Sequence, residues 1–194
     1  KKYCIDAIYE KQKTCETEID NLIDLIRSKR IKGLNITVPF KQTVLNKLDS
    51  LEISAKESKA VNTVYMQDDK AIGANTDGVG FVTSLKKDLG FKLKPKLNIL
   101  CIGAGGAAYG IICELLKFKP NRIDIINRTE LSALNLIDYF KKNFNSKNTL
   151  FNFLPWNHAP EAYFDLIINT SSCGMKTHDK FQLKLDLLSK KVFI

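Results

Sequence analysis

Residues 99–108 read Ile-Leu-Cys-Ile-Gly-Ala-Gly-Gly-Ala-Ala, and helix-forming residues continue from there to Lys117. An apolar run of strand length therefore enters a glycine-rich turn, and a helix leaves it. Gly103 allows a tight turn, Gly105 lets a pyrophosphate approach the backbone, and Ala108 lets helix and strand pack closely. This pattern predicts a dinucleotide-binding turn at a helix N-terminus, with a glycine turn of another kind of α/β protein as the alternative. The residues of the predicted turn are Gly103, Ala104, Gly105, Gly106 and Ala107.

The next apolar strand ends in Asn127, Arg128 and Thr129, near the position where NAD enzymes place an acidic residue on the ribose. A carboxylate would repel a 2′-phosphate, whereas a guanidinium binds one through charge-assisted hydrogen bonds. We therefore expect NADP as the cofactor. Asp124 is a rival ribose ligand inside the strand, and the alternative for Arg128 is a solvated side chain beside a helix start.

Strand and helix patterns alternate through the second half of the chain, which predicts a parallel sheet. We expect an α/β protein of two domains, with a Rossmann-type doubly wound parallel sheet over residues 78–194. Besides the glycine-turn strand and helix, the predicted elements are strands at Arg122–Ile126, Leu150–Leu154, Asp165–Asn169 and Lys191–Ile194, and a helix at Glu130–Lys142.

Residues 1–77 form a separate small α/β unit in this interpretation. One apolar face, made by Ile19, Leu22, Ile23 and Ile26, predicts a helix over Glu16–Lys29. The other predicted elements are strands at Tyr3–Ile8 and Ile31–Val38, a short helix at Thr43–Leu48, paired strands at Ala60–Met66 and Ala71–Ala74, and a helix from Thr76 toward Leu89.

Two segments of the first half carry polar residues suited to chemistry. Asn35 and Thr37 share one face of a predicted strand, and Lys41 follows where Pro39 ends it. Asp77 falls in the first turn of a predicted helix, where the dipole favours a carboxylate. A lysine and an aspartate facing one cleft make an acid/base pair. The alternatives are a polar edge strand exposed to solvent, and a surface lysine and a helix-capping aspartate that never meet.

The composition is ordinary for a globular protein, with 44% hydrophobic and 26% charged residues among 194. The net charge of +9 comes from scattered basic residues without a nucleic-acid motif, so we expect no nucleic-acid partner. No apolar run reaches the ~20 residues that span a bilayer. Five cysteines without paired or metal-ligand spacing predict reduced thiols in a cytoplasmic protein and no metal site. The sequence allows a homodimer.

Six segments, in order along the chain, resemble the motifs of shikimate dehydrogenases. They are Gly-Leu-Asn-Ile-Thr-Val-Pro-Phe-Lys (33–41), Ala-Val-Asn-Thr (60–63), Asn-Thr-Asp-Gly (75–78), Gly-Ala-Gly-Gly-Ala (103–107), Asn-Arg-Thr (127–129) and Asn-Thr-Ser-Ser-Cys-Gly-Met (169–175).

This resemblance implies reversible reduction of 3-dehydroshikimate to shikimate with NADPH, in the chorismate pathway of aromatic amino acid biosynthesis. It implies that Lys41 and Asp77 are the catalytic pair and that Asn35, Thr37 and Asn62 bind the substrate. It also implies that the glycine turn holds the pyrophosphate and that residues 127–129 hold the 2′-phosphate. An NAD-dependent quinate/shikimate dehydrogenase and a non-catalytic, truncated dinucleotide-binding module are the alternatives.

The chain departs from the family pattern in three places. We expect the first domain to be incomplete at its start, because nothing before Tyr3 supplies the family's Ser-x-Ser segment for the substrate carboxylate. We expect the C-terminal return helices, which carry a substrate-contacting Gln in the family, to be absent. Ser132 stands where the family often has a second basic residue, so the NADP prediction depends mainly on Arg128.

Overall fold

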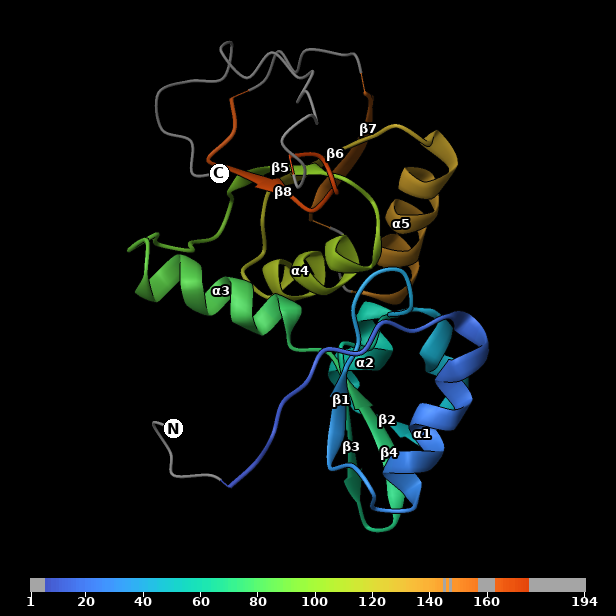
Figure 1. Ribbon diagram of the computed structural model, residues 1–194. Coiled ribbons are helices and arrows are strands. Elements are labelled where there is room, and N and C mark those ends of the chain that lie inside the picture. Colours follow the sequence, from blue (N-terminus) through green and yellow to red (C-terminus); the bar gives the residue numbers. More distant parts are fainter. Residues whose placement is uncertain (1–5, 145, 147, 157–162, 175–194) are drawn as a thin grey trace.

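The chain folds into two four-stranded sheets, each accompanied by its own helices (Figure 1). The computed structural model describes residues 6–144, 146, 148–156 and 163–174. The first sheet is built from residues before Asp77, and the second from residues after it. The predicted α/β class is confirmed, with a mixed sheet in the first half and a parallel sheet in the second.

The first half contains η1 (Glu16–Glu18), α1 (Ile19–Arg27), β1 (Gly33–Asn35), η2 (Thr43–Lys47), β2 (Ser50–Leu51), α2 (Ile53–Ser58), β3 (Thr63–Gln67) and β4 (Lys70–Ala74). The strand order is β1-β3-β4-β2, in which β3 is antiparallel to both neighbours and β2 is parallel to β4. The predicted pairing of β3 with β4 is confirmed. Asp68 and Asp69 both have positive φ in the turn between them, a conformation that aspartate tolerates better than most residues.

The predicted apolar face of α1 is confirmed, because Ile19, Ile23 and Ile26 are buried against the mixed sheet. These side chains share one core with Val64 and Ala71 of the adjacent strands. Repetition every three to four residues places apolar side chains on one side of a helix, and their burial is the main source of its stability.

The second half contains α3 (Asp77–Lys87), β5 (Asn98–Ile102), α4 (Gly106–Leu116), β6 (Arg122–Asn127), α5 (Glu130–Asn143), β7 (Leu150–Pro155) and β8 (Leu166–Asn169). All its strand pairs are parallel, in the order β7-β6-β5-β8. The chain builds outward from β5 to β7 and then returns to the other side of β5. In open α/β sheets, ligands bind beyond the carboxyl ends of the strands at such a switch point.

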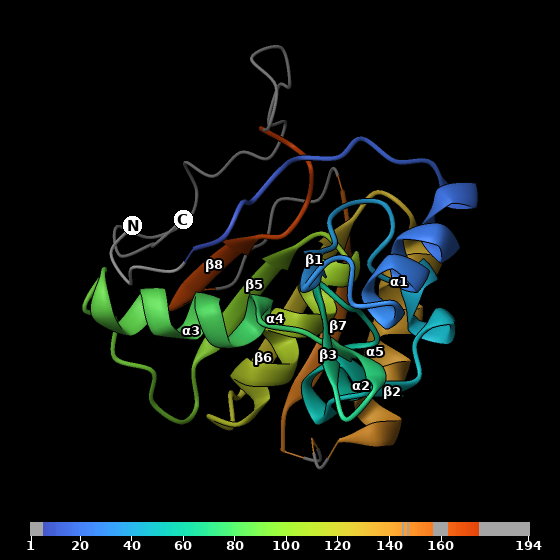
Figure 2. The ribbon, with the colours of Figure 1, turned by 60° about the horizontal axis from the view of Figure 1, so that its bottom comes forward.

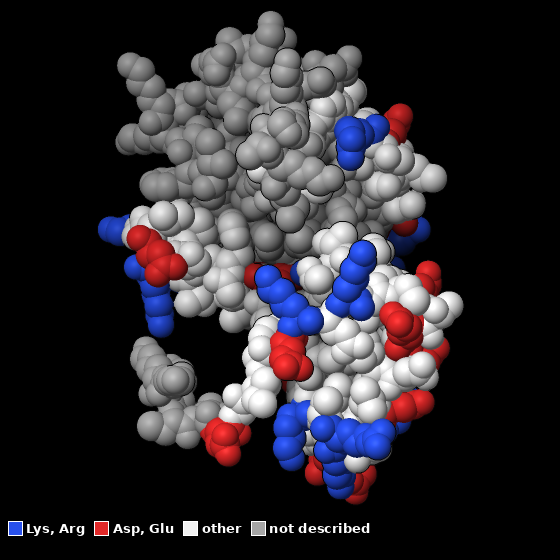
Figure 3. All heavy atoms as spheres, in the orientation of Figure 1, with Lys and Arg blue, Asp and Glu red and all other residues white. Residues whose placement is uncertain are grey.

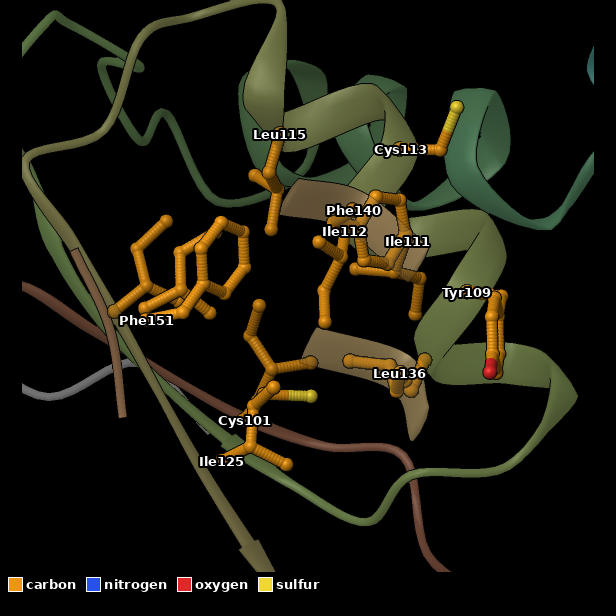
Figure 4. Packing of buried hydrophobic residues seen from close by; sticks show 14 of the residues in the cluster. Cys101, Tyr109, Ile111, Ile112, Cys113, Leu115, Ile125, Leu136, Phe140 and Phe151 are labelled. Atoms are coloured by element: carbon orange, nitrogen blue, oxygen red, sulfur yellow. The ribbon is translucent and has the colours of Figure 1, made fainter. Parts of the chain in front are cut away.

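Helices α3, α4 and α5 share one core with one face of the parallel sheet. Figure 4 shows the centre of this core, where Ile112 and Leu115 of α4 approach Cys101, Ile125 and the ring of Phe151. In Figure 2, α3 and α4 lie against β8, β5 and β6. The opposite face buries a smaller cluster that includes Leu100, Ile102, Ile126 and Ile167. Successive side chains of these strands thus point to opposite faces of the sheet, and both faces are buried, as expected for a parallel sheet.

The domain boundary between residues 77 and 78 stays a prediction. Helix α3 begins at Asp77, next to the mixed sheet, and its Val82 and Leu85 belong to the core beside the parallel sheet.

Several predicted elements differ from the structure. Residues 6–8 form no strand, because their backbone has no ladder partner, and Ile8 is exposed. Residues 3–5 and the predicted strand at Lys191–Ile194 lie outside the described part. The strand expected over Ile31–Val38 is only three residues long, because only Gly33–Asn35 pairs with β3. The short elements β2 and α2 were not predicted. No helix in the described ranges is long and apolar enough to cross a membrane.

Candidate active site

The side chains of Lys41 and Asp77 meet at the junction of the two halves. Lys41 Nζ donates to Asp77 Oδ2 over 2.7 Å, and the two side chains are only 17% and 23% exposed. Asp77 is the first residue of α3, where the helix dipole favours a negative charge. Lys41 comes just before η2, and its carbonyl accepts a hydrogen bond from the Val61 N–H at 2.7 Å. The pair is therefore held by backbone contacts from two separate segments.

Asn62 completes the surroundings of the aspartate. Its Nδ2 donates to Asp77 Oδ1 at 2.7 Å and to Thr76 Oγ1 at 3.0 Å, and its Oδ1 accepts from the Thr76 N–H at 3.0 Å. Asn62 is 9% exposed, and both ends of its buried amide are hydrogen-bonded, so the amide is fixed in one orientation. Both carboxylate oxygens of Asp77 thus have a donor, which holds this side chain in one orientation.

Asn35 and Thr37 take different positions. Asn35 Nδ2 lies 3.4 Å from both the Asn62 carbonyl and Thr63 Oγ1, so Asn35 borders the Lys41–Asp77 pair through Asn62. Thr37 is exposed in the loop after β1, and its carbonyl accepts from the Phe40 N–H. The period-two alternation that placed both residues on one strand face does not extend to Thr37, because β1 ends at Asn35.

The glycine-rich turn lies between β5 and α4, as the sequence predicts. Gly103 has a φ of +107°, and a Cβ there would lie 2.9 Å from the Ser171 nitrogen and from Thr170 Oγ1. Gly105 is exposed at the N-cap of α4, and a Cβ there would meet no atom within 4 Å. The turn is thus filled on its inner side and open on its outer side, where the α4 N–H groups face outward. This arrangement fits a bound pyrophosphate.

The same turn adjoins the Lys41–Asp77 pair. A Cβ added at Gly106, the first residue of α4, would lie 3.8 Å from Lys41 Cβ and 3.7 Å from Ala60 Cβ. The Cβ atom of Lys41 therefore lies beside the start of the helix that follows the turn. A substrate held by the pair and a nucleotide held by the turn would lie next to each other.

The end of β6 continues the nucleotide side of the site. The Gly103 N–H donates to the Ile126 carbonyl at 2.8 Å, which places the turn beside Asn127, Arg128 and Thr129. Asn127 Nδ2 donates to the Thr129 carbonyl at 2.8 Å. Arg128 is exposed, and among the described residues its guanidinium has no hydrogen bond or ion pair. This guanidinium is available for an anionic group of a ligand.

Asp124 is not available as a ribose ligand. Its side chain is buried, accepts two hydrogen bonds of 2.6 Å from the Arg122 guanidinium, and accepts a third of 2.8 Å from Asn152 Nδ2. These hydrogen bonds also raise the pKa of Arg122. Both oxygens of this buried carboxylate are already hydrogen-bonded within the sheet. The rival interpretation of Asp124 is therefore wrong.

Sequence reasoning assigned no role to two residues that support these groups. Thr170 follows β8, and its Oγ1 lies 3.0 Å from the Ile102 carbonyl and 3.2 Å from the Gly103 carbonyl, so it holds the inner side of the glycine turn. Asn75 lies beneath Asp77 and contacts its backbone. Both stand in segments that the sequence singles out, but their roles depend on contacts with distant segments. Among the described residues, no group of three or more His, Cys, Asp or Glu could hold a metal ion.

Comparison with known proteins agrees with this geometry. Residues 1–64 match the family model of the shikimate dehydrogenase substrate-binding domain. The whole chain is 41% identical to a shikimate dehydrogenase (NADP(+)) of Pelagibacter ubique (strain HTCC1062) and covers 68% of that protein.

Two solved structures are also similar. The shikimate dehydrogenase of Aquifex aeolicus is 33% identical, with a TM-score of 0.77, over 92% of this chain and 64% of that one. Shikimate 5-dehydrogenase of Thermus thermophilus, in complex with NADP(H) and shikimate, is 27% identical, with a TM-score of 0.76, over 92% and 62%. The chain thus spans about two thirds of the length of these relatives. With its identity to the Pelagibacter protein and its matching fold, the chain belongs to the shikimate dehydrogenase family.

Proposed function

We propose that this protein catalyses the reversible reduction of 3-dehydroshikimate to shikimate with NADPH. The observation that carries this proposal is the Lys41–Asp77 pair, 2.7 Å apart, beside the first residue of the helix that follows the glycine turn. The relatives named as NADP-dependent shikimate dehydrogenases support the choice of substrate and cofactor.

The pair suits proton transfer to and from an alcohol. A substrate hydroxyl placed against Lys41 Nζ gives its proton to the Lys41 amine as the carbon loses hydride. In the reverse direction, the Lys41 ammonium returns this proton to the substrate oxygen. Asp77 orients the lysine amine and, held by Asn62, keeps its own carboxylate in place to accept from a substrate hydroxyl. Asn35, Thr37 and Asn62 are the proposed polar contacts for the other hydroxyl groups.

The residues around the turn fit a dinucleotide. When bound, NADP accepts the hydride from the alcohol carbon or supplies it to the ketone. Residues 103–107 would hold the pyrophosphate against the α4 N-terminus, because Gly105 leaves its outer side open. The guanidinium of Arg128, with Asn127 and Thr129, would hold the 2′-phosphate. The pairing of Asp124 with Arg122 supports NADP over NAD, because no free carboxylate faces the ribose from β6.

The decisive test follows NADPH formation by absorbance, with the intact protein, shikimate and NADP+. Activity with this combination is expected, and kcat/KM is then compared for shikimate and quinate with each of the two cofactors. A higher kcat/KM with quinate and NAD+ would indicate the quinate/shikimate alternative. Tight NADPH binding without turnover of either substrate would indicate a non-catalytic dinucleotide-binding module.

We also propose a cytoplasmic location, since Cys101 and Cys113 are buried as free thiols. The homodimer that the sequence allows stays a prediction, which light scattering on the intact protein would check. Figure 3 shows Lys and Arg side chains interspersed with Asp and Glu on one face. Some opposite charges form ion pairs, such as that of Lys29 with Asp69. Such mixing of charges supports the expectation of no nucleic-acid partner.

A further inference from the structure

Asn75 is a buried amide, 5% exposed, between β4 and α3. Its Nδ2 donates to the Ala60 carbonyl at 3.0 Å, and its Oδ1 accepts from the Asp77 N–H at 2.9 Å. Its own N–H donates to Ser54 Oγ at 3.1 Å. A buried amide used at both ends is fixed in one orientation, and the segments that it joins are fixed with it.

One end of this amide contacts Asp77, and the other contacts the segment that bonds to the Lys41 backbone. On one side it holds the backbone of Asp77. On the other it holds Ala60, whose neighbour Val61 donates its N–H to the Lys41 carbonyl. Asn75 therefore links the backbone supports of Lys41 and Asp77 through a single side chain.

Asn75 also contacts the helix that starts at the nucleotide turn. A Cβ added at Gly110 of α4 would lie 3.1 Å from Asn75 Oδ1, and one added at Gly78 of α3 would lie 2.2 Å from the Gly110 carbonyl. Helices α3 and α4 thus cross with backbone against backbone at this point, and the Asn75 amide fills the space beside the crossing. This crossing joins α4 to the helix that carries Asp77.

We propose that Asn75 is a positioning residue for hydride transfer: it fixes the Lys41–Asp77 pair relative to α4 and so relative to the cofactor turn. This inference rests on the proposed function. Near-attack geometry tolerates little displacement, and a shift of about 1 Å costs up to about a hundredfold in rate. Removing the Asn75 side chain leaves the substrate and cofactor contacts of other residues in place, so it should lower the rate of the chemical step rather than the affinity for either ligand.

The test replaces Asn75 by Ala in the intact protein, and Asn143→Ala serves as a control for the loss of an amide–carbonyl hydrogen bond from an exposed residue away from the candidate site. Asn143 also donates its Nδ2 to a backbone carbonyl, that of Tyr139 at 2.9 Å, but far along α5. For Asn75→Ala we expect kcat with shikimate and NADP+ to fall between about tenfold and a hundredfold, with both KM values within about threefold. The control should keep kcat within about twofold.

A deuterium label at the reacting carbon of shikimate separates positioning from loss of folded protein. The kinetic isotope effect on kcat should rise in Asn75→Ala, because the chemical step becomes slower, whereas a smaller folded fraction leaves the isotope effect unchanged. A fall in kcat without a rise in the isotope effect, or with an equal fall in Asn143→Ala, overturns the proposal.

A second variant and a measurement that does not depend on turnover test the same inference. Gly110→Ala keeps the amide but crowds it, and we expect a smaller fall in kcat of about two- to tenfold; wild-type kcat in both variants overturns the proposal. Hydrogen exchange of the Asp77 amide should be faster in Asn75→Ala than in the wild type. If the wild type does not turn over shikimate, the proposed function fails, while unchanged Asp77 exchange would by itself refute the positioning role.

Discussion

Replacing Lys41 by Met removes the proposed proton donor and keeps most of the volume of the side chain. Loss of a general acid or base typically costs between about a hundredfold and ten-thousandfold in rate, which is about 3–5 kcal/mol of activation free energy. KM for shikimate should change much less, because Asn62 and Asp77 stay in place. We therefore expect kcat to fall at least a hundredfold.

The same change should not unfold the protein. The pair is mostly buried, but Asp77 keeps the Asn62 amide at 2.7 Å and its place at the start of α3. We expect the free energy of unfolding to fall by about 1–2 kcal/mol, which lies between the contributions of exposed and fully buried ion pairs. Small domains are typically stable by about 5–15 kcal/mol, so the folded fraction stays close to one.

A matched control uses the same substitution at Lys47. Lys47 Nζ also lies 2.7 Å from a carboxylate, that of Asp20, and its side chain is 26% exposed, but it lies outside the candidate site. Initial rates of NADPH formation are measured for both variants, together with chemical unfolding. The reasoning is refuted if Lys41→Met keeps kcat within about twofold of the wild type, or loses no more than Lys47→Met.

Three further predictions concern the nucleotide side and the thiols. Arg128→Ala should lower kcat/KM for NADPH about tenfold to a hundredfold and leave kcat/KM for NADH nearly unchanged, since only NADPH carries the 2′-phosphate; equal losses would contradict the assignment. Thr170→Val should raise KM for NADP+ several-fold with little change in kcat, because the turn loses the contacts of the Thr170 hydroxyl with the Ile102 and Gly103 carbonyls; an unchanged KM would count against it. Burial raises the pKa of Cys101 to about 11 and, with Glu57 as neighbour, that of Cys113 to about 12, so iodoacetamide at pH 8 should modify exposed Cys15 before either of these buried thiols, as mass spectrometry would show; rapid labelling of either buried thiol would contradict the structure.

The longer helices and strands and the nucleotide turn are predictable from the amino-acid sequence. Apolar residues every three to four positions identify α1, and the strand–glycine turn–helix pattern at residues 98–116 is local. Such patterns depend on neighbours in the chain, so they can be read without the fold. The family motifs also named Lys41, Asp77 and Asn62, which the structure brings together.

Which of these residues contact one another depends on the folded chain. Lys41 and Asp77 are 36 positions apart in the sequence. Their hydrogen bond requires the fold to bring the start of α3 next to the segment in which Lys41 bonds to Val61. Asp124 is a rival ribose ligand by its sequence position alone, and its contacts with Arg122 and Asn152 exclude that role. The elements β2 and α2 are too short to show a periodic pattern of apolar residues. Residues 6–8 have a strand-like sequence but form no strand, because a strand also needs a neighbouring strand with which to pair. Contacts between distant segments have no local pattern, so the role of Asn75 follows from the folded chain alone.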